Sequence, residues 1–215
     1  MAFLRDIRKC RVCGGYTEEY RHCGRETVLL LPANLRLKLS KLISGILRHF
    51  PEQYGVKLDS GGYARIDDLV EGIRMRGYSW LTAEHVIAIV MLDPKGRFEL
   101  KDGLIRARYV HSVKVKLEFN EEVHEGVLYH GTTVEALKGI RRKGILPMKR
   151  LMVHLSGSFE AAKINALRKK GRHVVLEIDV KKLVRLGHKV YRASRDVYVT
   201  DYVPPSCIRR IIRID

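Results

Sequence analysis

Apolar residues recur at helical spacing in the middle of the chain and predict three helices. The clearest face follows the i, i+3, i+4, i+7 rule and consists of Leu39, Leu42, Ile43, Ile46, Leu47 and Phe50. Pro51 comes next and should end this helix, because proline cannot continue it. A second helix is expected with Asp67 as its cap, and a third from Thr82 to a point before Pro94. Their inward residues should be Leu69, Val70, Ile73, Val86, Ile89 and Val90.

A β-hairpin is predicted after the third helix. Two short apolar runs, residues 97–100 and 104–107, are separated by Lys101-Asp102-Gly103. Asp-Gly between such runs is typical of a tight hairpin turn. Three helices followed by a hairpin indicate a winged-helix module over residues 35–117.

Residues 118–215 have a different pattern, in which short strands dominate. Strands are expected at residues 127–130, 153–155, 174–178, 189–191, 197–199 and 208–214, with one helix at 133–142 that turns Ala136, Leu137 and Ile140 inward. The acidic stretch 118–125 is expected to be a linker. Short strands with few helices predict an α+β fold. No Gly-x-Gly-x-x-Gly follows a strand, so a Rossmann nucleotide site is not supported.

The charge balance points to a polyanionic partner. Lysine and arginine total 41 against 24 acids in 215 residues, a net charge of +17. Nucleic acid is the first candidate; a membrane surface, or a charged surface of the kind found in thermophilic proteins, is the alternative. No apolar run is long enough to span a membrane and no export signal is visible, so we expect a cytoplasmic protein without membrane attachment.

Two groups of residues are candidates for phosphate chemistry. Arg48-His49 ends the first predicted helix, where arginine can grip a phosphate and histidine can move a proton, although basic residues there also complement the helix dipole. The second group is an expected turn at 129–133, which contains His130, followed by a basic segment and by His154 on a short strand. Alone, such a turn is more often an ordinary strand-to-helix connection.

Taken together and in order, these segments resemble the tRNA 2′-phosphotransferase family from about residue 39 to residue 208. The matching motifs are residues 39–49, 62–69, 97–100, 128–132, 148–156 and 199–205. Two positions depart from the family pattern. Met152 stands where a histidine is usual, and Val110 stands where glycine usually precedes His111-Ser112.

The resemblance implies two lobes and their site residues. The first would be a winged helix that binds RNA, and the second, residues 118–215, would resemble the ADP-ribosyltransferase fold and bind NAD as a co-substrate. The family's basic catalytic set falls on Arg48, His49, Arg97 and Arg150. Its NAD-binding positions fall on His111, Ser112, His130, Gly131, Thr132 and His154.

The reaction implied by the resemblance has two steps. An internal RNA 2′-phosphate attacks the nicotinamide ribose of NAD and expels nicotinamide, which leaves an ADP-ribosylated RNA. The ribose 2″-hydroxyl then attacks phosphorus, so that RNA leaves with a free 2′-hydroxyl and the second product is ADP-ribose 1″,2″-cyclic phosphate. Arg48 and Arg97 would grip the phosphate, Arg150 would stabilise the second transition state, and His49 would position the ribose or move a proton. The expected partner is RNA that carries a 2′-phosphate, as in tRNA processing, and the protein should be a monomer.

The first 34 residues form a separate head with three of the four cysteines. Cys10, Cys13, His22 and Cys23 offer four soft ligands, and the Cys-x-x-Cys-Gly-Gly knuckle is typical of zinc ribbons. The segment is also similar to the small zinc ribbon of archaeal H/ACA particles, with Tyr20 where a cysteine would be expected. A structural zinc and a metal-free ribbon both fit this pattern.

Two other functions remain open. An ADP-ribosyltransferase acting on nucleic acid or protein would share the NAD lobe but would not need Arg48, His49 and Arg97. A non-catalytic RNA-binding winged-helix protein would explain the charge but not the pair His130 and His154.

Overall fold

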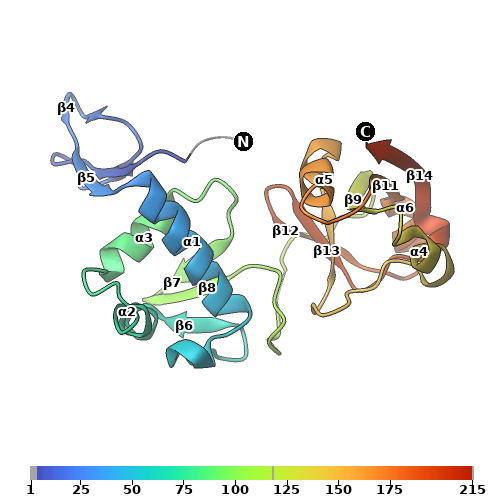
Figure 1. Cartoon of the computed structure of the whole chain (residues 1–215), viewed down its shortest axis with the longest axis horizontal. Coiled ribbons are helices and arrows are strands. Elements are labelled where there is room, and N and C mark those ends of the chain that lie inside the picture. Colours follow the sequence, from blue (N-terminus) through green and yellow to red (C-terminus); the bar gives the residue numbers. More distant parts are fainter. Residues whose placement is uncertain (1–3, 118, 215) are drawn as a thin grey trace. The chain divides into compact units, whose positions relative to one another are not determined.

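The computed structural model describes residues 4–117 and 119–214, which form an α+β protein (Figure 1). The chain divides into two compact units, Met1–Leu117 and Glu118–Asp215. Each unit has its own core and is described by itself. In the described part of the chain, no helix has the length and apolar character needed to cross a membrane.

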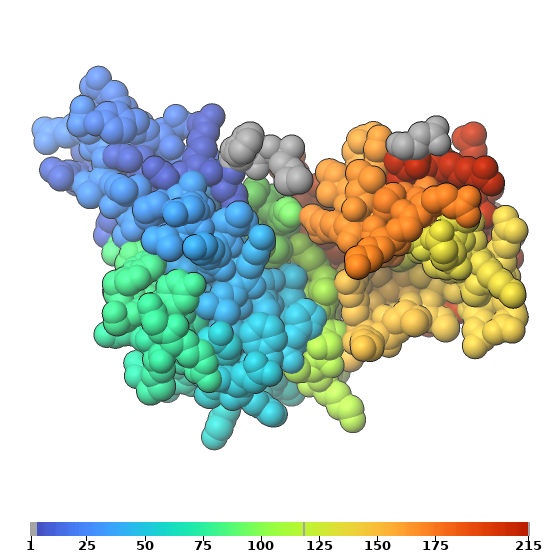
Figure 2. Space-filling model, viewed as in Figure 1, coloured from blue at the N-terminus to red at the C-terminus, as the bar shows by residue number. Residues whose placement is uncertain are grey.

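The head contains short strands. Strands β1 (Ile7–Lys9), β2 (Tyr16–Thr17) and β5 (Val28–Leu31) form an antiparallel sheet in the order β2-β1-β5, and β3 (Arg21–His22) pairs with β4 (Arg25–Glu26) as a separate hairpin. Ile7 and Leu31 are fully buried in the same core as the following helices. The head is therefore anchored to the first unit, at whose upper end it lies in Figure 2.

The first predicted helix is confirmed as α1 (Ala33–Arg48), with an apolar face buried in the core. It begins after Pro32, inside the range expected for the head, because proline is well placed immediately before a helix. It ends at Arg48, with His49 as its C-cap, before the expected stop at Pro51. The short 3₁₀ helix η1 (Glu52–Tyr54) follows.

The other two helices and the hairpin are also confirmed. Helices α2 (Ile66–Arg74) and α3 (Ala83–Met91) pack with a three-stranded antiparallel sheet of order β6-β8-β7, formed by β6 (Tyr63–Arg65), β7 (Phe98–Lys101) and β8 (Leu104–Ala107). Asp102 and Gly103 have φ of 48° and 76°, as a two-residue hairpin turn requires. Helix α3 begins directly after Thr82, its N-cap, where its start was expected. Asp67 does not cap α2, because the N-cap is Arg65 and Asp67 lies in the first turn.

The second unit is built on one six-stranded antiparallel sheet of order β12-β13-β10-β9-β11-β14. Its strands are β9 (Val127–Thr133), β10 (Val153–Ser156), β11 (His173–Asp179), β12 (Val190–Ser194), β13 (Val197–Thr200) and β14 (Ile208–Ile214). Helices α4 (Leu137–Lys143) and α6 (Val180–Arg185) contribute to the apolar core, α5 (Phe159–Ala166) packs on β9 and β11, and the 3₁₀ helix η2 (Pro205–Cys207) precedes β14.

Three expectations for this unit were wrong in whole or in part. Residues 129–133 do not form a turn, since β9 continues to Thr133 and pairs with β11 throughout. The helix expected at 133–142 is shorter and shifted, at Leu137–Lys143, and α5 and α6 were not expected. Part of the expected linker is bound to the sheet edge: Glu122 bridges Tyr191, and the amide of Val123 donates to the carbonyl of Val190 at 2.7 Å.

Candidate functional site

Arg48 is a buried cation at the end of α1, with only 8% of its surface exposed. Its guanidinium lies over the ring of Tyr109, 4.8 Å from the centroid. The Nε and Nη2 groups are buried and have no hydrogen-bond acceptor among residues 4–117 and 119–214. Buried guanidinium donors normally have an acceptor, so an anion would complete this site.

The surroundings of Arg48 weaken its charge but do not remove it. Burial lowers the pKa of Arg48 to about 10, with a further lowering from Arg97, while Tyr109 and Asp93 act in the opposite sense. At neutral pH the guanidinium therefore keeps its positive charge. A desolvated cation of this kind attracts an anion more strongly than an exposed one.

Arg97 is held rigidly at the start of β7. Its Nη2 donates to Oδ1 of Asp93 and to Oγ of Ser40 on α1, both at 2.6 Å. Its Nε also donates to the two carboxylate oxygens of Asp93 at 3.1 and 3.2 Å. The Asp93 side chain is 1% exposed, so this ion pair is largely shielded from solvent and fixes the guanidinium.

His49 and the segment after β8 are joined next to Arg48. The His49 Nδ1 and the Ser112 Oγ share a hydrogen bond of 2.9 Å, and the amide of Ser112 donates to the carbonyl of Arg48 at 3.0 Å. His111 is 1% exposed, and neither ring nitrogen has a partner in the described part of the chain. Burial, followed by the charges of Arg48, His49 and Arg106, lowers the pKa of His111 to about 4, so its ring is neutral at pH 7.

Val110 has a strained backbone beside this group. Its φ is 70°, in the left-handed region that β-branched residues rarely adopt. Glycine, which is usual at this position in the family that the sequence resembles, would adopt it without strain. The conformation positions the following residues, His111 and Ser112, against the end of α1.

In the second unit, β9 and β10 are joined by only one residue pair, Tyr129 with Ser156. On one side of that pair, Nδ1 of His130 donates to the carbonyl oxygen of His154 at 3.0 Å, so a side chain takes the place of a backbone ladder bond. The sheet therefore opens between these strands at the two histidines.

His130 lies in a cationic environment. Burial of its ring lowers its pKa to about 4, the hydrogen bond to His154 opposes this, and Lys169 and Arg150 lower it further. Arg150 and Lys169 are exposed on their outer sides, and partial desolvation by neighbouring atoms lowers the pKa of each; Arg150 lowers the pKa of Lys169 further. The Nζ of Lys169 donates to the carbonyl of Gly131 at 2.8 Å. His130, Arg150 and Lys169 thus form one cationic group with a neutral imidazole.

Gly131 and Thr132 are both buried on β9. A Cβ on Gly131 would lie 2.0 Å from the carbonyl oxygen of Ala162 and 2.8 Å from the amide nitrogen of Ala166, both on α5. Gly131 is therefore required for the close approach of α5 to the sheet.

The expected site residues lie in both units. Arg48, His49, Arg97, His111 and Ser112 come together in the first. The second holds the remaining members, which are Arg150, His130, Gly131, Thr132 and His154.

Three residues in contact with these sites were not anticipated. Asp93 is four residues before Arg97 in an Asp-Pro-Lys-Gly-Arg turn, a spacing that could have suggested the ion pair. Tyr109 and Lys169 carry no local signal, because each reaches its site only through the fold.

The head contains a third group of polar side chains. One ligand atom from each of Cys10, Cys13, His22 and Cys23 lies within 4.8 Å of all the others. Cys10 is buried and the other three are exposed. These four residues could hold a metal ion.

The chain is similar in sequence to a known protein family and to several of its members. Residues 34–202 match the model of a family described as RNA 2′-phosphotransferase, Tpt1 / KptA family. A probable RNA 2′-phosphotransferase of Pyrobaculum aerophilum is 45% identical over 97% of both chains. Proteins with the same name from Hyperthermus butylicus and Aeropyrum pernix are 44% and 45% identical, over 95% and 94% of this chain and 92% of each relative.

Proposed function

Because the chain belongs to the Tpt1 / KptA family of RNA 2′-phosphotransferases, we propose that it removes an internal 2′-phosphate from RNA with NAD as co-substrate. The first unit would act as a winged-helix lobe that binds RNA. The second would act as an ADP-ribosyltransferase-like lobe that binds NAD. The finding that carries this proposal is the buried guanidinium of Arg48 with two donors that lack an acceptor in the described residues.

A phosphate dianion suits Arg48. It supplies several acceptor oxygens for Nε and Nη2, and its charge compensates a cation that burial has desolvated. Arg97 lies near enough to lower the pKa of Arg48, and Asp93 with Ser40 holds its guanidinium in place. Two fixed guanidinium groups are the expected receptor for a 2′-phosphate, and they need not reorganise when charge develops on it.

His49 is suited to orient or deprotonate a hydroxyl group beside that phosphate. Its hydrogen bond to Ser112 fixes the ring at the end of α1. Ser112 is in turn held by the Arg48 carbonyl. A histidine with a defined orientation next to two arginines can accept a proton while they neutralise the phosphate.

The second unit offers features that fit a dinucleotide. Strands β9 and β10 share one residue pair, and the cations Arg150 and Lys169 lie near His130 at that place, where a pyrophosphate would be stabilised. NAD would supply the electrophilic ribose carbon and the hydroxyl group that finally takes the phosphate. His130 is neutral, and because its Nδ1–H donates to His154, its Nε2 can accept a hydrogen bond without repelling the positively charged nicotinamide ring.

Arg150 is the residue proposed to act on the second step. The RNA 2′-phosphate oxygen forms a bond to the ribose carbon as nicotinamide leaves, and the ribose 2″-hydroxyl then bonds to phosphorus as the RNA 2′-oxygen leaves. Negative charge builds on phosphoryl oxygens in that second displacement. A guanidinium in the cationic group with Lys169 would stabilise it.

The proposal is tested by incubating the protein with RNA that carries one 2′-phosphate, with and without NAD, in the presence of EDTA. Complete loss of the phosphate only with NAD, together with one nicotinamide and one cyclic-phosphate product per RNA, is expected. Turnover without NAD contradicts the proposal. An RNA that keeps its phosphate and accumulates ADP-ribose indicates an ADP-ribosyltransferase, and RNA binding without any product indicates a binding protein.

A further inference from the structure

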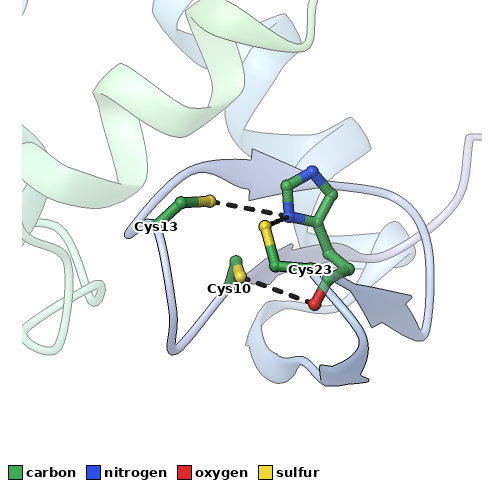
Figure 3. Close-up of side chains that lie close together, drawn as sticks. Cys10, Cys13 and Cys23 are labelled. Atoms are coloured by element: carbon green, nitrogen blue, oxygen red, sulfur yellow. Dashed lines mark hydrogen bonds between the residues drawn. The ribbon is translucent and has the colours of Figure 1, made fainter.

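The four ligand atoms in the head have the spacing of a tetrahedral metal site. The Cys13 Sγ lies 3.5 Å and the Cys23 Sγ 3.2 Å from the His22 Nδ1, and no two ligand atoms, including the Cys10 Sγ, are more than 4.8 Å apart. Around zinc, with bonds of about 2.3 Å to sulfur and about 2.0 Å to nitrogen, neighbouring ligand atoms are roughly 3.5–3.8 Å apart. Figure 3 shows the three cysteines turned toward one place.

The turn that carries the first two cysteines has the hydrogen bonds of a metal knuckle. The amide of Val12 lies 3.4 Å from Sγ of Cys10, and the amide of Gly15 lies 3.4 Å from Sγ of Cys13. Gly14 has a φ of 70°, which allows the backbone to turn back sharply. Backbone N–H groups directed at sulfur stabilise the thiolate form, which is the form that binds metals.

The turn that carries Cys23 allows His22 and Cys23, which are adjacent in sequence, to contact the same ion. Cys23 and Gly24 connect β3 to β4 with φ of 49° and 74°. Asparagine or aspartate is the usual residue at the first of these positions, so turn chemistry does not account for a cysteine. The left-handed conformation brings the Cys23 sulfur beside the ring of His22, its neighbour in sequence.

This part of the head has no core of its own. Every residue from 11 to 26 is exposed or only partly buried, and β2, β3 and β4 have two residues each. An isolated hairpin of that size is not stable in water, and small segments of this kind usually depend on a metal or disulfides. Cys13 and Cys23 of this part, and Cys10 just before it, are free in the structure.

We propose that Cys10, Cys13, Cys23 and the Nδ1 atom of His22 bind one structural zinc ion. The four ligands lie outside residues 34–202, which the family model matches. The ion would join the two turns of the ribbon. From there β1 continues to the core, where Ile7 is buried and Lys9 pairs with Glu84 of α3 at 2.5 Å. Loss of the metal should therefore unfold residues 11–26 and leave the α1–α3 core folded.

The first test is the zinc content of the full chain, purified without added metal or chelator. Wild type should contain about one zinc per chain. Cys13→Ser and Cys23→Ser should lose it, and both positions are exposed, so the α1–α3 core of these variants should still fold. Cys207→Ala and His124→Ala, which change residues outside the cluster, are the matched controls and should keep it. Wild type without zinc, or both serine variants with full zinc, would overturn the proposal, as would a native Cys13–Cys23 disulfide found by mass spectrometry.

The second test examines the ligand set and the consequence of metal loss. Cobalt added to the zinc-free chain should give the visible absorption of a tetrahedral ion with a thiolate charge-transfer band, and His22→Ala should weaken both. Hydrogen exchange should become fast in residues 11–26 on zinc removal and remain slow in α1. An octahedral cobalt spectrum, or unchanged exchange in the ribbon, would contradict the site or its structural role.

Discussion

The carboxylate of Asp93 holds the guanidinium of Arg97 by contacts from both Nε and Nη2, the shortest of which is 2.6 Å, and the Asp93 side chain is 1% exposed. Removing one member of a buried ion pair leaves the other charge uncompensated and costs about 3 kcal/mol. Asp93→Ala should therefore lower the free energy of unfolding by about that amount. It should also weaken binding of 2′-phosphorylated RNA, because Arg97 loses its fixed position.

Urea unfolding and RNA titration measure the two effects of Asp93→Ala. The control is Asp67→Ala, which breaks a solvent-exposed contact of 3.7 Å with Arg65 and should cost less than about 1 kcal/mol. Equal stability losses in the two variants would contradict a buried, orienting ion pair.

We expect Arg48 to be needed for phosphate removal but not to increase the free energy of unfolding. Its buried Nε and Nη2 donors lack partners among the described residues, so Arg48→Met should leave stability unchanged or raise it by about 1 kcal/mol. The same variant should lose phosphate removal by about 10²–10³-fold. Arg48→Lys should recover little, since an ammonium cannot present the planar set of donors.

Thermal unfolding and single-turnover rates separate the two properties of Arg48. Lys41→Met, on an exposed position of the same helix, should change neither by much. An Arg48→Met protein that is strongly destabilised and still active would show that this arginine is a structural residue.

Arg150→Ala should slow the second chemical step more than the first. Expulsion of nicotinamide starts from a cationic ring, whereas the second step places more negative charge on phosphorus, so loss of one guanidinium should slow it about 10²–10³-fold. The ADP-ribosylated RNA should accumulate and migrate as a slower band in single-turnover gels. Arg141→Ala, an exposed arginine of α4, serves as the control. Clearance of the adduct at the wild-type rate by Arg150→Ala would refute this role.

Stability should fall below pH 6.5 because of His111. Its pKa is lowered to about 4 by burial and by the neighbouring cations Arg48, His49 and Arg106, so between pH 4 and 6.5 the unfolded chain binds more protons than the folded one. Stability therefore rises with pH through this window and does not depend on this group above it. At pH 5 the loss is about 2 kcal/mol, and His111→Phe should abolish it.

Urea unfolding at pH 7 and pH 5 measures how far the free energy of unfolding falls on acidification, in wild type and in His111→Phe. The exposed His124→Ala variant should follow wild type. If His111→Phe loses as much stability on acidification as wild type, a charged His111 is tolerated in the folded protein.

Gly131→Ala should destabilise the second unit by about 3 kcal/mol, since the new methyl group would lie 2.0 Å from the carbonyl of Ala162. The matched control is Gly139→Ala on α4, where no atom lies within 4 Å and alanine should add about 0.5–1 kcal/mol. Thermal unfolding of both variants provides the comparison. A Gly131→Ala protein as stable as wild type would mean that α5 can move away from β9.

The elements that could be predicted from the sequence are those whose buried residues recur at a regular spacing, or whose turn residues are characteristic. The face of α1, the Asp102-Gly103 hairpin and β14 each follow a local rule of spacing or turn chemistry. Helix α5 has no such pattern, because its closest packing depends on the small residues Ala162 and Ala166 and on a glycine of a distant strand. The continuation of β9 through residue 133 was missed for a similar reason, since a glycine and two threonines resemble a turn until β11 pairs with them.

The types of residue needed for the chemistry were visible in the sequence: arginines and histidines in the order of a known family, and four metal-ligand side chains near the N-terminus. Residue type and spacing are properties of the chain itself, and they determined the class of reaction to expect. Tertiary structure decided which donors of Arg48 lack partners, which carboxylate holds Arg97, and how Cys23 reaches the ring of His22. These depend on desolvation and on contacts between segments far apart in the chain, or on a backbone conformation that local preference does not favour, so no local pattern could encode them.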